Sequence, residues 1–404
     1  MSSMVKIPAF RFGNFSSSYK QFKLGEITNS VSRPIKMEDE EDYNLVTVKR
    51  RNEGIVDRGI FKGREIKVKS QYKIEVGDFL ISKRQIIHGA CEIVPRNLDG
   101  AIVSNEYHIL HGKKNLLLTE YLNLLSKLPK IKNYFALACV GVDIEKMLFR
   151  IEDWKKRSVT IPSIDEQQKI TSFFKLLNQK IEKQQEKIEK LEELKKGMMQ
   201  KIFSQERRFK DNNGGEFEEW EEKRLKDIAD IVGGGTPSTS NENYWGGNIQ
   251  WFTPTEISRT KFVSLSKRSI TELGLNKSSA RLLPPGTILL TSRATLGEMA
   301  IAPSPVTTNQ GFQSIIPKED TDSEFIYYLQ PLIKKHCYEK ASGSTFLEIS
   351  KSNLEAFTTK IPSFEEQKKI SNFLSVFDIK IDKERMSLET IIEMKKGFMQ
   401  KMFV

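Results

Sequence analysis

The sequence predicts an α+β protein in which two mixed α/β modules are separated by two long helices that form an antiparallel coiled coil. The first observation behind this fold class is an internal repeat. Ile161–Phe203 and Ile361–Phe403 agree at about 20 of 43 positions, without a gap, at an offset of 200 residues. Stacked repeat proteins have periods of about 20–50 residues, so this repeat is of another kind. The sequence contains two copies of one unit, a module followed by a long helix. This duplication indicates an internal pseudo-two-fold repeat.

The repeat divides the chain into five segments. Residues 205–222 include the run Asp211-Asn212-Asn213-Gly214-Gly215, which is typical of turns and indicates a linker. The expected segments are 1–160 (first module), 161–204 (first spacer helix), 205–222 (linker), 223–360 (second module) and 361–404 (second spacer helix).

The start of each helix carries its own signal. Ser163 is followed three residues later by Glu166, and Ser363 by Glu366. This spacing is typical of a capping box, in which the two side chains satisfy free amides of the first helical turn. We therefore expect both helices to begin just after a Pro-Ser pair.

Along both helices, apolar residues recur at spacings of three and four, which predicts one narrow apolar stripe. Forty residues at about 1.5 Å each make a rod of about 60 Å, and such a rod needs a partner helix. The other copy is the obvious partner, and antiparallel pairing places the two modules at opposite ends. The predicted helix–helix and subunit-docking residues are Ile170, Phe174, Leu177, Ile181, Ile188, Leu191, Ile370, Leu374, Phe377, Ile381, Leu388 and Ile391.

Two pairs of polar or small residues interrupt these helices at equivalent places. Gln184 and Glu384 stand where the stripe calls for an apolar residue, which indicates either a register-fixing position or a tolerated wet site. Gly197 and Gly397 each lie within Lys-Lys-Gly-x-Met-Gln-Lys. A glycine in a helix interior costs about 1 kcal/mol relative to alanine. It predicts a kink, a close approach by a neighbour, or a helix end followed by a short second helix.

Composition limits the class of protein. The chain has 404 residues, a formal charge of +11 and a pI near 9.2, which fits either an anionic partner such as nucleic acid or a merely basic protein. The three cysteines are scattered and only four histidines accompany them, which argues against a zinc site and favours packed, reduced thiols. The sequence shows no signal peptide and no apolar run long enough to cross a bilayer, so we expect a cytoplasmic protein.

The two modules resemble each other only faintly. Tyr19 with Leu24–Ile27 parallels Trp220 with Leu225–Ile228, and Gly77–Ser82 parallels Gly286–Thr291 as a turn that leads into a strand. The second module adds ordered motifs: Gly233-Gly234-Gly235-Thr236-Pro237-Ser238, Tyr244-Trp245-x-Gly247, Trp251-Phe252-Thr253-Pro254, Ser292-Arg293-Ala294-Thr295-Leu296-Gly297 and Thr308-Asn309-Gln310-Gly311-Phe312.

Together with the two Ile-Pro-Ser-x-[Asp/Glu]-Glu-Gln helix openings, these motifs resemble the specificity (S) subunit of type I DNA restriction–modification systems. The resemblance covers nearly the whole chain. It implies a non-catalytic subunit whose two target recognition domains each read one half of a bipartite double-stranded DNA site. It further implies two methylation subunits that bind S-adenosylmethionine, and restriction subunits that use ATP and Mg. The first module departs from the family pattern, with Asn29–Pro34 where a Gly-Thr-Pro-Ser loop is expected.

DNA binding calls for lysine and arginine at phosphates, and for arginine, amide or hydroxyl side chains at base edges. Each candidate alone can also be an ordinary solvated charge or a turn residue, and Asn309 can cap its own turn. The candidate DNA-binding residues are Lys49, Arg50, Arg51, Asn52, Lys83, Arg84 and Asn105 in the first module, and Thr236, Ser238, Tyr244, Arg293, Asn309 and Gln310 in the second.

The alternatives are an autonomous enzyme, either a nuclease or a methyltransferase, and a coiled-coil spacer with protein-binding modules. The chain has no Asn-Pro-Pro-Tyr or Asp-Pro-Pro-Tyr, and no phosphate-binding G-x-x-x-x-G-K-[ST]. Asp57 with Glu65-Ile66-Lys67 has the residue types of a nuclease, but a half-buried strand with solvated charges accounts for the same pattern. The sequence therefore predicts no catalytic residues, no metal site and no cofactor of its own.

Overall fold

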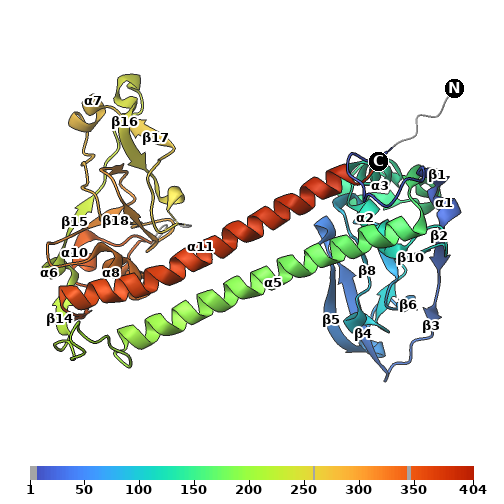
Figure 1. Cartoon of the computed structure of the whole chain (residues 1–404), viewed down its shortest axis with the longest axis horizontal. Coiled ribbons are helices and arrows are strands. Elements are labelled where there is room, and N and C mark those ends of the chain that lie inside the picture. The colour runs from blue at the N-terminus through green and yellow to red at the C-terminus, as the bar shows by residue number, and fades with distance from the viewer. Residues whose placement is uncertain (1–6, 258–259, 344–346) are drawn as a thin grey trace. The chain divides into compact units, whose positions relative to one another are not determined.

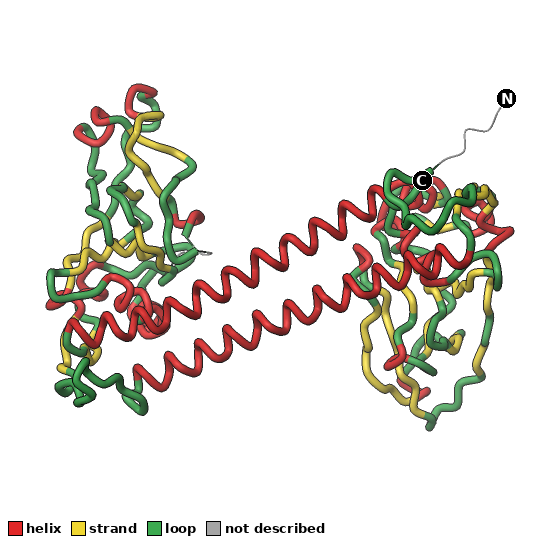
Figure 2. The backbone as a smooth tube through the Cα atoms, in the orientation of Figure 1, coloured by secondary structure: helices red, strands yellow, loops and turns green. Residues whose placement is uncertain are grey.

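A computed structural model describes residues 7–257, 260–343 and 347–404 (Figure 1). The chain forms two compact units. Unit 1 comprises the residues up to Glu186 together with Arg385–Val404, and unit 2 comprises Lys187–Glu384. Each unit contains one module and one half of each long helix. These helices, α5 (Ile164–Phe203) and α11 (Phe364–Lys401), are continuous, as Figure 2 shows.

The first module is built mainly from short strands. Its strands are β1 (Lys20–Lys23), β2 (Thr28–Val31), β3 (Pro34–Ile35), β4 (Asp42–Val48), β5 (Ile55–Lys62), β6 (Gln71–Lys73), β7 (Phe79–Ser82), β8 (Cys91–Ile93), β9 (Ile102–Ser104), β10 (Tyr107–Gly112), β11 (Cys139–Val140), β12 (Leu148–Phe149) and β13 (Ser158–Ile161). Its helices are α1 (Leu24–Ile27), α2 (Thr119–Ser126), α3 (Pro129–Leu137) and α4 (Ile151–Lys155).

The second module has fewer strands. They are β14 (Glu221–Arg224), β15 (Ala229–Gly233), β16 (Trp245–Phe252), β17 (Arg268–Ile270), β18 (Thr287–Leu290), β19 (Met299–Ala302), β20 (Thr307–Thr308), β21 (Gln313–Pro317) and β22 (Thr358–Ile361). Its helices are α6 (Leu225–Ile228), α7 (Glu272–Asn276), α8 (Ser323–Tyr328), α9 (Gln330–Lys340) and α10 (Lys351–Glu355).

The two modules share one topology despite their divergent sequences. A four-stranded sheet has the order β2-β10-β7-β8 in unit 1 and β15-β21-β18-β19 in unit 2. A two-stranded ladder, β1-β13 or β14-β22, leads into the long helix in both. A second sheet is built around a parallel pair, β4 with β9 or β16 with β20. It has five strands in unit 1 and three in unit 2, because β3 and β6 extend it only in the first module.

The first turns of each long helix are part of a module core. Ile170 and Phe174 belong to the core cluster of unit 1, and Ile370 and Leu374 to that of unit 2. The sequence assigned these four residues to helix–helix pairing and subunit docking, and the structure adds a place in the module cores. Their side chains are buried against the module, because β13 and β22 pair with strands of the module and lead directly into α5 and α11. All twelve predicted stripe residues are buried or half-buried.

The two helices run antiparallel within each unit, as predicted. In unit 1 the ring centroids of Phe173 on α5 and Phe398 on α11 are 5.0 Å apart. In unit 2 Lys195 on α5 forms an ion pair with Asp378 on α11. Glu384, which interrupts the apolar stripe, forms an ion pair between the two helices in unit 2: its carboxylate lies 2.6 Å from the Lys187 ammonium.

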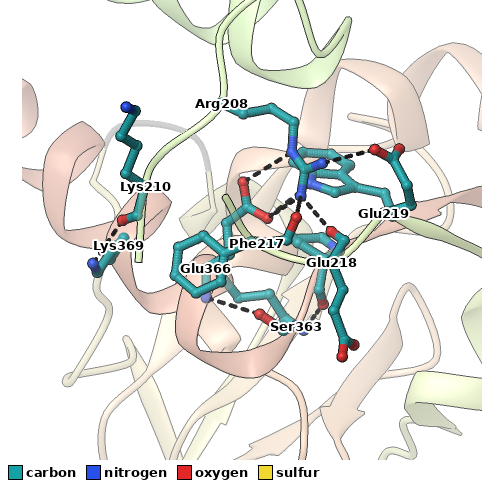
Figure 3. A network of polar contacts seen from close by, with 11 residues as sticks. Arg208, Lys210, Phe217, Glu218, Glu219, Ser363, Glu366 and Lys369 are labelled. Carbon is teal, nitrogen blue, oxygen red and sulfur yellow. Dashed lines mark hydrogen bonds and ion pairs between the residues drawn. The ribbon is translucent and has the colours of Figure 1, made fainter. Parts of the chain in front are cut away.

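The glutamates of the two helix openings do not close capping boxes by reaching back, as the sequence led us to expect. The Ser363 hydroxyl does accept from the Glu366 amide at 3.4 Å. However, the buried Glu366 carboxylate accepts from Arg208 and from the indole of Trp220, both at 3.0 Å, in the network of Figure 3. A carboxylate without solvent is stable only when it is paired in this way.

Unit 1 repeats this arrangement with different residues. Glu166 is buried and accepts from Arg11 at 2.8 and 2.7 Å and from the Tyr19 hydroxyl at 3.0 Å. The guanidinium of Arg11 and the phenol of Tyr19 both have raised pKa values; the hydrogen bond to Glu166 is the main cause for Arg11, and burial for Tyr19. In each unit the segment before the module is therefore bound to the helix start.

The glutamine after each glutamate fixes the module to the helix a second time. Gln167 accepts from the Leu118 amide at 2.9 Å and donates to the carbonyls of Leu116 and Pro162. Gln367 accepts from the Asp322 amide at 2.9 Å and donates to equivalent carbonyls. The repeated Glu-Gln pair thus anchors the loop before α2 or α8 as well as the helix itself.

Two further expectations need correction. The segment 205–222 is more than a polar linker: Arg208 binds Glu366, and the ring of Phe209 packs on Phe373 with centroids 5.5 Å apart. Gly197 and Gly397 neither end nor break their helices, and an added Cβ at either would meet no described atom within 4 Å. Their repetition is therefore not explained by packing within the described residues.

Candidate nucleic-acid interface

In the second module, the glycine-rich loop after β15 packs against the segment after β20. A Cβ on Gly234 would lie 2.0 Å from the carbonyl oxygen of Asn309, and one on Gly235 would lie 2.3 Å from Ser279. Only glycine permits this approach. The loop thus packs closely on neighbouring backbone. This brings Thr236 to Gln310, whose Oε1 accepts from the Thr236 hydroxyl at 2.5 Å.

Two tryptophans of β16 are fixed by the same loop. The indole N–H of Trp251 donates to the carbonyl of Gly235 at 2.9 Å, and that of Trp245 to the carbonyl of Ser238 at 3.1 Å. Tyr244 is half-buried, with its backbone against Gly274 of α7. Predicted residues 236, 238, 244 and 310 therefore belong to one connected surface.

Arg293 joins this surface through a tight turn. The Ser292 amide donates to the carbonyl of Gly311 at 2.8 Å, which sets the turn beside Asn309 and Gln310. Asn309 uses its side chain locally, since its Oδ1 accepts from the Gly311 amide at 2.9 Å. The turn contains Ala294 at φ 62°, in the left-handed region that alanine rarely adopts.

In the first module, the candidates Lys49–Asn52 form the turn between β4 and β5. Arg51 and Asn52 have φ values of 60° and 58°. The Asn52 amide donates to the carbonyl of Gly89 at 2.9 Å, and Arg50 pairs with Glu145 at 2.7 Å. Arg51 is exposed, so the turn presents its guanidinium to solvent.

The remaining first-module candidates form a second group. Lys83 donates to the carbonyl of Asn105, and Arg84 pairs with Glu106 at 2.9 Å. Arg84 and Arg293 both stand seven residues after a turn glycine, Gly77 or Gly286, at the end of equivalent strands. Equivalent turns of the two modules thus carry an arginine.

Backbone strain accompanies the candidate turns. Among the described residues, five non-glycine residues have positive φ, and three of them (Arg51, Asn52 and Ala294) lie in these turns. For Arg51 and Ala294 the cost is about 1–2 kcal/mol relative to a helical or extended backbone, whereas asparagine adopts this conformation more readily. Strain of this kind persists at sites that serve recognition or catalysis.

Sequence reasoning missed Arg268. Its guanidinium carbon lies 3.5 Å from the centroid of the Trp245 ring and 5.6 Å from that of Trp251. The sequence signal was weak, because 23 residues separate Arg268 from the Tyr-Trp motif; strand pairing of β17 with β16 brings them together.

The catalytic alternatives find no support in the part of the chain that the structure describes. No group of three His, Cys, Asp or Glu side chains there could hold a metal ion. Asp57 accepts from the Gly59 amide and Glu65 from the Lys62 amide, both at 2.8 Å, so each carboxylate caps a local turn. All three cysteines are free and buried, and burial raises the pKa of the Cys91 thiol to about 11. In the described residues, no helix is long and apolar enough to cross a membrane.

The sequence model of the family described as "Type I restriction modification DNA specificity domain" matches residues 16–193 and 217–393. The specificity subunit of the MjaIX type I restriction enzyme from Methanocaldococcus jannaschii is 42% identical over 194 residues, which is 47% of this chain and 45% of that protein. The HindI specificity subunit from Haemophilus influenzae is 22% identical over 92% of this chain and 96% of its own length.

Solved structures agree on the fold. The S subunit of a type I restriction–modification system from M. genitalium covers 99% of both chains with a TM-score of 0.61 at 15% identity. A chain from a study of complex assembly in the type I system gives 0.58 at 17% identity, over 95% of this chain and 97% of that one. Since the family match is made twice and includes both modules and most of both helices, the chain belongs to the family of type I restriction–modification DNA specificity subunits.

Proposed function

We propose that this chain is the subunit that recognises DNA for a type I restriction–modification complex, with one module for each half of a bipartite site. The observation that carries the proposal is the repetition of one topology with different side chains on its turns. Residues 1–160 and 223–360 are the proposed reading domains. The family's subunits are not catalytic, and the chain itself is proposed to hold no cofactor.

The turns after β7 and β18 lie at corresponding places in the two modules, and the other proposed reading surfaces lie on different elements. In the first module the reading surfaces are the β4–β5 turn with Arg51 and the turn after β7 with Arg84. In the second they are the glycine-rich loop after β15, the turn after β18 with Arg293, and the segment at Asn309. Cationic and amide side chains on short, fixed turns suit contacts to phosphates and base edges.

The long helices are proposed to set the spacing of the half-sites and to hold partner subunits. Each helix leaves large apolar side chains exposed, among them Leu176 at 65%, Leu194 at 53% and Ile379 at 67%. Exposed apolar residues on a helix mark protein interaction surfaces when they are grouped. The proposed partners are two methylation subunits that bind S-adenosylmethionine, and restriction subunits that use ATP and Mg.

Co-expression of the chain with a methylation subunit from the same genome tests the function. Modified adenines would be mapped in the host DNA, and a bipartite methylated motif with a fixed spacer is the expected result. Purified complex should also lose affinity steeply as salt rises, because each phosphate contact releases counterions. Methylation without a bipartite motif, or salt-insensitive binding to a protein ligand, would contradict the proposal and favour an autonomous enzyme or a protein-binding spacer.

A further inference from the structure

Among the described arginines of the second module, only Arg268 lies on an aromatic ring. Its guanidinium lies against the Trp245 ring at 3.5 Å, and the Trp245 and Trp251 rings meet edge to face with centroids 5.0 Å apart. Such cation–π contacts favour a flat guanidinium over an indole and fix its plane. The cation is therefore held in a defined orientation.

The two indole rings beneath the guanidinium, Trp245 and Trp251, form a platform that is itself fixed. Trp251 is only 4% exposed. Both indole N–H groups donate to carbonyls of the glycine-rich loop, so neither ring can turn without breaking a hydrogen bond. The pairing of β16 with β17 is irregular between Trp245 and Ile249, where Ile270 faces both residues. A β-bulge of this type bends the strand locally and changes the direction in which its side chains point.

The hydrogen-bonding edge of Arg268 is left without a partner. Within the described residues, its side chain makes no hydrogen bond or ion pair, and the residue is exposed. Arg208, in contrast, is bound to Glu366, Glu219 and two carbonyls. An arginine has five N–H donors, and stacking on an indole uses none of them.

The location suits a groove of DNA. Among the described strands, β16 pairs only with β17 before Trp251, and this antiparallel ribbon lies at the end of unit 2 away from the Phe364–Glu384 part of α11, as Figure 1 shows. The major groove of B-form DNA accepts a two-stranded ribbon. Thr236 and Gln310, which flank the same platform, add groups that can bind base edges.

We propose that Arg268, held flat on Trp245, reads a guanine in the half-site of the second module. This inference rests on the proposed function and adds a specificity-determining residue to it. A phosphate can also be bound by a point charge, which a mobile lysine supplies. A planar pair of donors fixed in orientation matches the O6 and N7 acceptors of guanine, the commonest specific contact in protein–DNA complexes.

The test compares three variants in the assembled methyltransferase. Arg268→Lys keeps the charge but removes the planar donor pair, Arg268→Ala removes both, and Lys267→Ala removes a neighbouring exposed charge as the control. For each complex, the methylated motif is mapped and binding is measured on duplexes that carry each base at every position of the second half-site. The salt dependence of binding is measured in parallel.

We expect the wild-type complex to require a guanine at one position of that half-site. Arg268→Lys should reduce discrimination at this position by about 5- to 150-fold, the range for one bidentate base contact, while the first half-site stays fully specific. Retained discrimination at the other positions of the second half-site shows that the second module is folded. Lys267→Ala should leave the motif unchanged.

Unchanged discrimination in Arg268→Lys would overturn the inference. A uniform loss of affinity in Arg268→Ala, with a salt slope smaller by about 0.9 and an intact motif, would assign Arg268 to a phosphate instead. Both outcomes leave the proposed function standing, because the bipartite motif remains. A wild-type complex without any bipartite motif would refute the proposed function itself.

Discussion

The guanidinium of Arg208 lies 3.0 Å from the carboxylate of Glu366, which has no solvent exposure. Arg208 comes just after α5, whereas Glu366 starts α11, so this pair ties the end of one helix to the start of the other within unit 2 (Figure 3). Unit 1 reproduces it between Arg11 and Glu166. The repeated glutamate is thus a structural anchor for the segment that enters each module.

Replacement of this anchor should destabilise its unit. We expect Glu366→Gln to lower the free energy of unfolding by about 2–3 kcal/mol, because it removes the buried counter-ion of the Arg208 guanidinium and leaves that guanidinium paired with the exposed Glu219. Glu365→Gln is the control, since Glu365 is exposed and its replacement should change stability by less than about 0.5 kcal/mol. Urea unfolding followed by tryptophan fluorescence measures both. Equal effects of the two variants would show that the buried pair is not an anchor.

The sequence predicted the helices and their pairing well, because their signal is local. Spacing of apolar residues and Pro-Ser openings are visible within one segment, and α5 begins at Ile164 as expected. The partners of Glu366 were not visible, since Arg208 and Trp220 lie 158 and 146 residues away from it. The two glutamates looked like capping residues because a capping box has the same spacing.

The candidate interface was predictable in the second module but only partly in the first. Glycines that permit a close backbone approach, such as Gly234, can be recognised in the sequence. An arginine that stacks on tryptophans from another strand cannot. Arg268 gains its role from the strand pairing with β16, which no local pattern reveals. In the first module, the turn at Arg51 and Asn52 uses non-glycine residues at positive φ, so the usual turn signal is absent.

The Lys195–Asp378 ion pair of unit 2 has no counterpart in unit 1. In unit 2 Lys195 pairs with Asp378, but the positions 200 residues away are occupied by Asn178 and Lys395. Both line a cavity of about 700 Å³ between α2, α3 and the end of α11. Burial, and next the charge of Lys127, lower the pKa of Lys395. The ammonium of Lys395 is therefore disfavoured by folding, and stability falls as pH drops from the ordinary lysine pKa to the lowered folded-state pKa.

Asn178→Asp should restore the missing pair. The new carboxylate raises the pKa of Lys395 and should stabilise the protein by about 0.5–1 kcal/mol at neutral pH. The gain requires an ionised aspartate and a protonated lysine, so it should disappear as pH falls below about 4 and as it rises above about 10. Gln179→Glu adds the same charge at an exposed neighbouring site and serves as control. Urea unfolding across this pH range measures both; equal gains would refute the pair.

In the strained turn of the first module, we expect a substitution at Arg51 to have opposite effects on protein stability and on DNA affinity. Arg51→Gly removes a side chain that disfavours φ 60°, so stability should stay the same or rise by up to about 1 kcal/mol. Affinity for DNA should nevertheless fall, with a salt slope lower by about 0.9 if Arg51 meets one phosphate. Ala294→Gly is the matched control for the backbone, since it relieves φ 62° without loss of charge. Loss of stability in Arg51→Gly would show that the side chain itself holds the turn.

The antiparallel helices predict that the spacing of the half-sites follows helix length. Removal of one heptad from each helix, Lys180–Glu186 and Lys380–Met386, leaves the Phe173–Phe398 contact of unit 1 and the Lys195–Asp378 pair of unit 2 in place. Seven residues at about 1.5 Å shorten a helix by about 10 Å, or about three base pairs of DNA. The methylated motif of the deleted variant should therefore keep both half-sites and lose about three base pairs from its spacer. Removal of either heptad alone breaks the register between the helices and should lower stability, which distinguishes spacing from helix pairing. An unchanged spacer in the double deletion would show that another part of the complex sets the distance.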